Sequence, residues 1–299
     1  MRQIHNMSKP LFSKPLLMPD PDAEGLTTTL SGIDAQGASI ELPVVTEKPV
    51  TIFLNKQEIV TSMTIGDHPQ ALAVGFLYNQ NMLHSADEIA AIDYDPEIDV
   101  VVVRTHEDTN FEEKLKKRIR TSGCAQGTIF GDIMDRFEQV NLSAEARIHT
   151  SELIALSKAI NTAPSLYLKA GAIHGCVLAK QAEPFLYVED IGRHNAVDKI
   201  AGMMLLEAID GADKIFYTTG RLTSEMVLKT AIMGIPILVS RSGFTAAGVA
   251  LARQANMTLI GRAKGSRFVA LSGHERIIFD QKIDASALQE GVSAQRQKT

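Results

Sequence analysis

The chain has 299 residues, of which 45% are hydrophobic and 22% charged, so it is long enough to form a sizeable core. This length and composition predict a soluble globular protein of two domains. A formal net charge of -5 argues against a dedicated nucleic-acid binder, and no apolar run is long enough to span a bilayer. The two cysteines, Cys124 and Cys176, are too few for a disulfide framework or a four-cysteine zinc site. Since no signal-like apolar segment lies near the first residue, we predict a cytoplasmic protein with reduced thiols.

The first part of the chain predicts a flexible arm followed by a small α+β domain. Residues 1–25 contain four prolines and little periodicity, which favours an arm. The domain is expected over residues 26–125, with a helix at 70–78 that is capped by Asp67 and has Pro69 in its first turn. Its strands are expected at residues 39–42, 50–54 and 99–103.

A basic helical segment then leads into a polar loop that contains Cys124. Residues 111–120 carry five lysines and arginines, and the segment Thr-Ser-Gly-Cys-Ala-Gln-Gly follows them directly. A charge run on a helix is usually a solvated face. This run ends beside a cysteine in a glycine-containing loop, and nearby cations lower the pKa of a thiol. We therefore predict that Cys124 is the chemically active residue, the alternative being an inert small hydrophobe.

Residues 126–275 predict a second domain of the α/β class, and residues 276–299 predict a polar tail. Short apolar strands alternate with longer amphipathic helices, a pattern that is typical of right-handed crossovers and a largely parallel sheet. The strands are expected at residues 176–179, 184–188, 214–218, 235–239 and 257–260, and the helices at 151–160, 196–209, 224–233 and 245–256.

Three strand–turn–helix junctions of this domain combine glycine, arginine and polar side chains. They span residues 190–195, 218–225 and 240–245, and we expect the crossovers to bring them to one edge of the sheet. The N–H groups of a helix N-terminus, together with arginine, suit an anion such as phosphate. Ordinary helix capping is the alternative explanation for any single junction. The candidate binding residues are Asp190, Arg193, His194, Gly220 and Arg221.

A fourth polar turn, at residues 261–267, has two arginines and one lysine around a glycine, which suits diphosphate groups. No Walker loop or dinucleotide fingerprint is present, so adenylate and nicotinamide chemistry are not indicated. No metal site is predicted either, because a zinc deaminase needs an acid two residues after its histidine and a Pro-Cys-x-x-Cys segment. Cys176 is expected in the core, and His174 is expected to line the pocket. The candidate residues of the turn are Arg262, Ala263, Lys264, Gly265, Ser266 and Arg267.

The segment Glu-Asp-Ile-Gly-Arg-His-Asn-Ala-Val-Asp-Lys, residues 189–199, closely resembles the signature of the FdhD family of formate dehydrogenase accessory sulfurtransferases. Further segments agree with the family in the same order, so the resemblance covers most of the chain, from residue 46 to residue 272. Several motifs in one order are more specific than a single pattern. These segments are residues 47–54, 71–77, 121–127, 220–221, 224–226 and 259–267.

The resemblance implies a three-layer core like that of the cytidine deaminases and a contact between residues 261–267 and the molybdenum cofactor. It also implies that Cys124 takes sulfur from a cysteine desulfurase as a persulfide and delivers it to this cofactor for formate dehydrogenase. The cofactor, molybdopterin guanine dinucleotide, would be a bound client and not a permanent prosthetic group. The family often has a second cysteine shortly after the first, but this chain has Ala125, Gln126 and Gly127, so the loop has no second thiol for a dithiol step.

Two alternatives use the same residues. The first is a non-enzymatic carrier of the cofactor, in which Cys124 only anchors it. The second is a nucleotide-modifying enzyme of deaminase ancestry, which tightly bound zinc would favour. Persulfide formation on Cys124 distinguishes the sulfurtransferase from both. A homodimer is the default expectation for the oligomeric state, and no nucleic-acid or membrane partner is expected.

Overall fold

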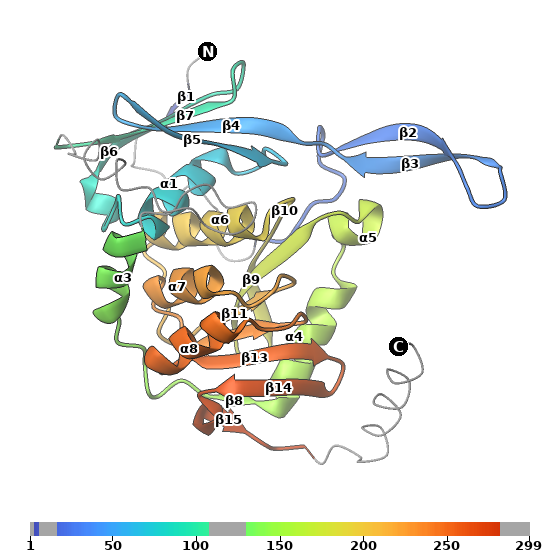
Figure 1. Cartoon of the computed structure of the whole chain (residues 1–299). Helices are drawn as coiled ribbons and strands as arrows, with labels where there is room; N and C mark the ends of the chain where they lie inside the picture. Colours follow the sequence, from blue (N-terminus) through green and yellow to red (C-terminus); the bar gives the residue numbers. More distant parts are fainter. Residues whose placement is uncertain (1–2, 6–16, 108–129, 282–299) are drawn as a thin grey trace.

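The structure, a computed structural model, describes residues 3–5, 17–107 and 130–281, which form two halves with separate sheets (Figure 1). The N-terminal half has a five-stranded sheet with the order β1-β6-β7-β4-β5, in which the β4–β7 pair is parallel and the other pairs are antiparallel. This sheet includes the strands predicted at residues 50–54 and 99–103. Its strands are β1 (Gln3–His5), β4 (Lys48–Leu54), β5 (Gln57–Thr64), β6 (Ile89–Asp95) and β7 (Val100–Thr105).

Two further features complete this half. The strands β2 (Thr27–Ile33) and β3 (Ser39–Val45) pair as an antiparallel hairpin that projects from the body of the protein (Figure 1). The helix α1 (Pro69–Asn79) confirms the helix predicted at residues 70–78 and packs against the sheet, after which the short turn η1 (Ala86–Glu88) leads into β6.

The C-terminal half has a six-stranded sheet with the order β10-β9-β11-β12-β13-β14, and its pairing corrects the prediction of a largely parallel sheet. The pairs β11–β12 and β12–β13 are parallel, and the other three are antiparallel. Two of the antiparallel pairs are consecutive strands joined by two residues, too few for the crossover that a parallel pair needs. The strands are β9 (His174–Lys180), β10 (Glu183–Asp190), β11 (Ile215–Thr218), β12 (Ile237–Ser240), β13 (Thr258–Lys264) and β14 (Arg267–Ser272).

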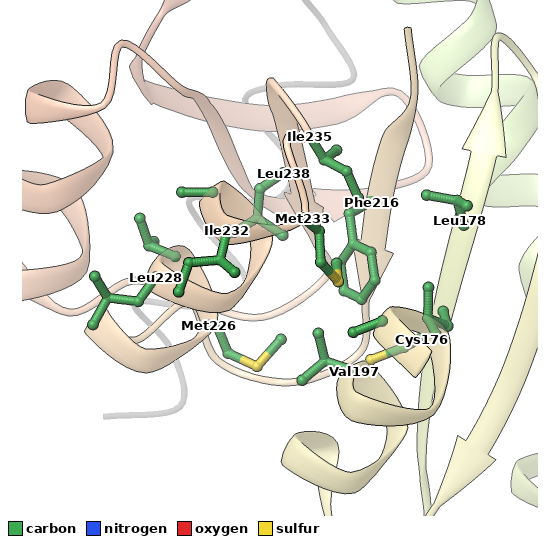
Figure 2. Close-up of a cluster of buried hydrophobic side chains, with 14 of the residues drawn as sticks. Cys176, Leu178, Val197, Phe216, Met226, Leu228, Ile232, Met233, Ile235 and Leu238 are labelled. Atoms are coloured by element: carbon green, nitrogen blue, oxygen red, sulfur yellow. The ribbon is translucent and has the colours of Figure 1, made fainter. Parts of the chain in front are cut away.

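Helices cover both faces of this sheet and give three layers. Alternate residues of β9 point to opposite sides, so that Cys176 and Leu178 join the cluster drawn in Figure 2, whereas Val177 packs in the cluster of α4. The predicted helices are confirmed with shifts of a few residues at their ends, while the likeness to a deaminase core stays a prediction. The helices on one face are α6 (Arg193–Leu206), α7 (Ser224–Ile232) and α8 (Ala246–Gln254), with α3 (Phe130–Glu138) beside α7; α4 (Thr150–Thr162) covers the other face, followed by α5 (Leu166–Ala170).

Helices α1 and α6 join the two halves by packing backbone against backbone. A methyl group on Gly75 would lie 1.7 Å from the carbonyl oxygen of Asp198. One on Gly202 would lie 1.9 Å from the carbonyl oxygen of Ala71. Both positions are glycine because no side chain fits between helices at this separation. The two halves are therefore held in a fixed relation by direct helix contact.

We expect Gly202→Ala to lower the free energy of unfolding by about 1–3 kcal/mol, because the new methyl group pushes α1 and α6 apart. Helix propensity acts in the opposite direction, since alanine is favoured over glycine by about 1 kcal/mol in a helix interior. Urea unfolding measures the difference. Gly32→Ala is the control, because its methyl group would meet Ile40 at an ordinary 4.0 Å. Wild-type stability of Gly202→Ala would contradict the close helix contact.

Both ends of the described chain are attached to the fold, which corrects parts of the predicted arm and tail. Near the start, β1 pairs with β6, and Leu17 pairs with Leu186. Near the end, Arg276 is 1% exposed and β15 pairs with β8. The predicted boundary at residue 125 lies outside the described residues. The elements are β8 (Ile148–His149), η2 (His274–Arg276) and β15 (Ile277–Ile278).

Among the residues that the structure describes, every helix is too short or too polar to cross a membrane.

Candidate functional site

The three polar junctions predicted from the sequence lie at one edge of the C-terminal sheet. Strands β10, β11, β12 and β13 run in the same direction, so their carboxyl ends meet at this edge. The strand register places Asp190 opposite His174, and Thr218 opposite both Cys176 and Ser240. The predicted arrangement of the junctions is confirmed, while ligand binding at the edge stays a prediction.

The junctions also contact one another through the backbone. The N–H of Leu222 in the second junction donates to the carbonyl oxygen of Gly243 in the third (2.9 Å). The N–H of Arg262 donates to the carbonyl oxygen of Ser242 (2.7 Å). The β13–β14 hairpin is thereby held against the same edge as the junctions.

Arginine side chains gather at this edge. A methyl group on Gly220 would lie 2.5 Å from Cδ of Arg193, so the glycine makes room for that side chain. Arg221 and Arg241 are both exposed, and the Arg241 guanidinium lies 5.3 Å from the ring centroid of Tyr167, within range of a cation–π contact. The second and third junctions thus present their arginines to solvent, whereas Arg193 is half-buried between the first and the second.

Asp190 is fully buried, which corrects the expectation that its side chain binds a ligand at this edge. Its carboxylate forms an ion pair with Lys199 (2.5 Å) and accepts hydrogen bonds from the Thr64 hydroxyl and from the Asn195 amide (2.9 Å). Thr64 belongs to β5 of the N-terminal half. Asp190 therefore holds the β10–α6 turn against that half, and does not present a carboxylate to a ligand.

Lys199 connects the same turn to the loop before α1. Its ammonium group pairs with Asp67 as well as with Asp190, and donates to the Glu189 carbonyl oxygen (3.2 Å). Burial alone would lower the pKa of Lys199, but the two carboxylates together raise it above its usual value. The prediction that Asp67 caps α1 is wrong. The N-cap is His68, whose φ is 48°, and the Asp67 carboxylate pairs with Lys199 instead.

A cavity of about 460 Å³ lies where the two halves meet, and we call it the junction cavity. Residues 60–63 of β5 and part of α1 line it from one side, and residues 191–195 line it from the other. Its titratable and charged lining residues are His174, Arg193, His194, Asp198, Glu225 and Lys229.

A buried ion pair lies beside this cavity. The Lys229 ammonium is 2.9 and 2.8 Å from the two carboxylate oxygens of Asp198, and the Asn79 amide donates to the same carboxylate (2.7 Å). This ion pair was not predicted from the sequence. A sequence pattern could have indicated it. Asp198 follows His194 by four residues, and Lys229 follows Glu225 by four, so the two residues of each helix lie on one face of that helix.

His174 lines the junction cavity, as expected, and its Nδ1 lies 3.2 Å from the Thr219 hydroxyl. Burial lowers the pKa of His174, and the nearby guanidinium groups of Arg193 and Arg221 lower it further. Its ring is therefore neutral at physiological pH. Cys176 is completely buried, which confirms its predicted place in the core, and burial raises the pKa of its thiol to about 12.

The segment at residues 261–267 is a β-hairpin, which corrects the prediction of a polar turn that follows a strand. Residues 261–264 belong to β13 and Arg267 begins β14. The side chains of Arg262, Lys264 and Arg267 are exposed, whereas that of Ala263 is buried. Three cations thus extend from the same edge, while Ala263 packs inward; Gly265 and Ser266 form the turn.

The Cys124 loop and the basic segment before it lie outside the described residues, so their placement stays a prediction. Within the described ranges, histidine, cysteine and acidic side chains form no group of three or more that could hold a metal ion.

These features define an α/β protein with two main sheets, in which a cationic sheet edge lies beside a polar cavity between the halves. The chain belongs to the FdhD/NarQ family, whose model matches residues 45–278.

Relatives and a solved structure agree with this assignment. The chain is 31% identical to a sulfur carrier protein FdhD of Bacillus pumilus, over 78% of this chain and 90% of the relative. It is 32% identical to a sulfur carrier protein FdhD of Listeria innocua, over 80% and 92% of the two chains. A crystal structure described as a proposed formate dehydrogenase accessory protein from Desulfotalea psychrophila matches with a TM-score of 0.69 at 28% identity, covering 84% of this chain and 98% of the other.

Proposed function

We propose that this protein is a sulfur carrier that accepts persulfide sulfur on Cys124 from a cysteine desulfurase and passes it to the molybdenum cofactor for formate dehydrogenase. The names of its relatives and of the matching structure support this class of function. The observation that carries the assignment to Cys124 is the burial of the other thiol. Cys176 has no exposed surface and a strongly raised pKa, so it is unsuited to act as a nucleophile.

The uptake step needs no external oxidant or reductant. The Cys124 thiolate attacks the terminal sulfur of the desulfurase persulfide, a bond forms between the two sulfurs, and the desulfurase cysteine leaves as a thiolate. The number of S–S bonds is unchanged. The intact mass of the protein after incubation with a cysteine desulfurase and cysteine tests this step, because uptake adds the mass of one sulfur atom and reductant removes it.

The cationic edge supports the cofactor part of the proposal. The guanine nucleotides of the cofactor would bring phosphate groups, which only accept hydrogen bonds. The sheet edge offers arginine donors beside helix N-termini. Arg193, Arg221, Arg262 and Lys264 are the residues we propose for these phosphates, with Asp190 holding the first junction in place. His194, which lines the adjoining junction cavity, would contact the part of the cargo nearest the sulfur.

Guanosine diphosphate is expected to bind as a partial mimic of the cofactor, and Arg262→Ala or Lys264→Ala should each weaken binding by about tenfold or more. A charge-assisted hydrogen bond contributes on the order of 1.5–3 kcal/mol when it is desolvated. Titration calorimetry measures the affinity, and higher salt should weaken it. Arg104→Ala is the control, since Arg104 is an exposed arginine of the N-terminal sheet that pairs with Asp93. Wild-type affinity in both hairpin variants would remove the hairpin from the site.

The same chemistry sets the expected partners and location. A desulfurase and a formate dehydrogenase must both reach Cys124, and reduced thiols favour action in the cytoplasm, with the homodimer as the expected state. A cofactor carrier that merely anchors its cargo would bind guanosine diphosphate but take up no sulfur.

A further inference from the structure

His194 and Glu225 meet at the wall of the junction cavity. His194 lies in the first turn of α6 and Glu225 in the first turn of α7. Their side chains are only 17% and 19% exposed, and Nδ1 of the imidazole lies 3.4 Å from Oε1 of the carboxyl group. Nδ1 is buried and has no hydrogen-bond partner among the described residues. A proton held between these two atoms would satisfy it.

The charges around the pair decide where that proton resides. Lys229 lies 3.8 Å from Glu225, but it already has a counter-charge in Asp198, which it contacts through both carboxylate oxygens. Burial raises the pKa of Glu225, and the neighbouring Asp198 raises it further, against the effects of Lys229 and Arg193. The site therefore disfavours the ionised form of Glu225 more than an exposed site would.

His194 is surrounded by cations. Burial lowers its pKa to about 2, and Lys229, Arg193, His174 and Arg221 all act in the same direction. An imidazolium at this position would be desolvated next to like charges, so the ring stays neutral. A neutral ring carries one N–H, and its tautomer follows from the bond at the other nitrogen.

We propose that the carboxyl proton of Glu225 is hydrogen-bonded to Nδ1 of His194, so that His194 presents a neutral Nε2–H donor to the junction cavity for an anionic sulfane sulfur. This inference rests on the proposed sulfur-carrier function and names the group that the cavity holds. A persulfide anion accepts hydrogen bonds and has no need of a donated proton. A neutral N–H donor holds it without protonating it, and Arg193 adds a positive charge beside it.

Nuclear magnetic resonance on the full-length protein tests the proton directly. With ¹⁵N-labelled histidine and ¹³C-labelled glutamate, we expect an Nε2–H tautomer for His194 and a protonated carboxyl for Glu225 at neutral pH. His194→Gln and Glu225→Gln assign the two signals. An Nδ1–H tautomer, or an ionised Glu225 at neutral pH, overturns the proposal. Neither measurement requires a desulfurase, so failure of sulfur uptake and failure of this inference are separate results.

Thiosulfate, an anion with a terminal sulfur, is the probe for the donor. The amide nitrogen of glutamine takes the place of Nε2 and that of asparagine the place of Nδ1, so His194→Gln should bind thiosulfate at least about tenfold more tightly than His194→Asn, a difference of 1.4 kcal/mol. His84→Gln is the matched control, because His84 forms a comparable contact with Glu88 (3.3 Å) on the surface, away from the cavity. Equal affinity in the two His194 variants, or no binding of thiosulfate to the wild type, overturns the proposal.

Discussion

Cys124→Ser is expected to take up no sulfur from a cysteine desulfurase and to leave formate dehydrogenase inactive, while binding guanosine diphosphate as the wild type does. A serine hydroxyl cannot form a persulfide, and Ala125, Gln126 and Gly127 offer no second thiol in the loop. The phosphate contacts proposed for the sheet edge do not involve this residue. Intact mass after incubation with desulfurase and cysteine, with and without reductant, measures the uptake.

Cys176→Ser is the matched control for this experiment. The Cys176 thiol is buried, and its sulfur lies 3.3 Å from the Thr218 hydroxyl, which can also hydrogen-bond to a serine. Even if the new hydroxyl were unpaired, the free energy of unfolding would fall by about 1–3 kcal/mol. The folded fraction should take up sulfur normally. If Cys124→Ser still matures the client enzyme at the wild-type rate, the sulfur-carrier proposal is wrong, and a carrier that binds the cofactor without the help of Cys124 remains.

Asp198→Leu is expected to destabilise the protein by about 3–5 kcal/mol, because it leaves the buried Lys229 ammonium without its counter-charge. The Asn79 amide loses its acceptor in the same variant. The double variant Asp198→Leu with Lys229→Met should recover much of this loss, since it removes both charges and fills the space with apolar groups. Urea unfolding of the wild type, both single variants and the double variant gives the coupling energy.

The double-variant cycle has a clear contrary result. A loss in the double variant equal to the sum of the two single losses would mean that the charges do not interact in the folded protein. The exposed pair Lys180–Asp213 (2.6 Å) is the control, since an ion pair at the surface contributes little stability and its variants should change the free energy of unfolding only slightly.

The sequence by itself determined the elements of the C-terminal half and the position of its polar junctions. The strand at residues 214–218 and the helix at 224–233 were recognisable because hydrophobic periodicity is a local property of ten or so residues. The junctions share an edge because consecutive crossovers keep the strands in one direction, a rule that needs no knowledge of the partners. The buried place of Cys176 followed from the same apolar strand pattern.

Only the tertiary structure decided strand pairing and the roles of the buried charges. The sheet is mixed because β9 and β14 are added as antiparallel partners through two-residue turns, which the strand pattern alone did not reveal. Asp190 looked like a surface ligand in the sequence, yet it is buried because Thr64, 126 positions earlier, and Lys199 satisfy its carboxylate. Whether a charged side chain is buried depends on the partners that the packing of α1 on α6 brings close to it. These partners are far apart in the sequence, so no local segment of the chain reveals them.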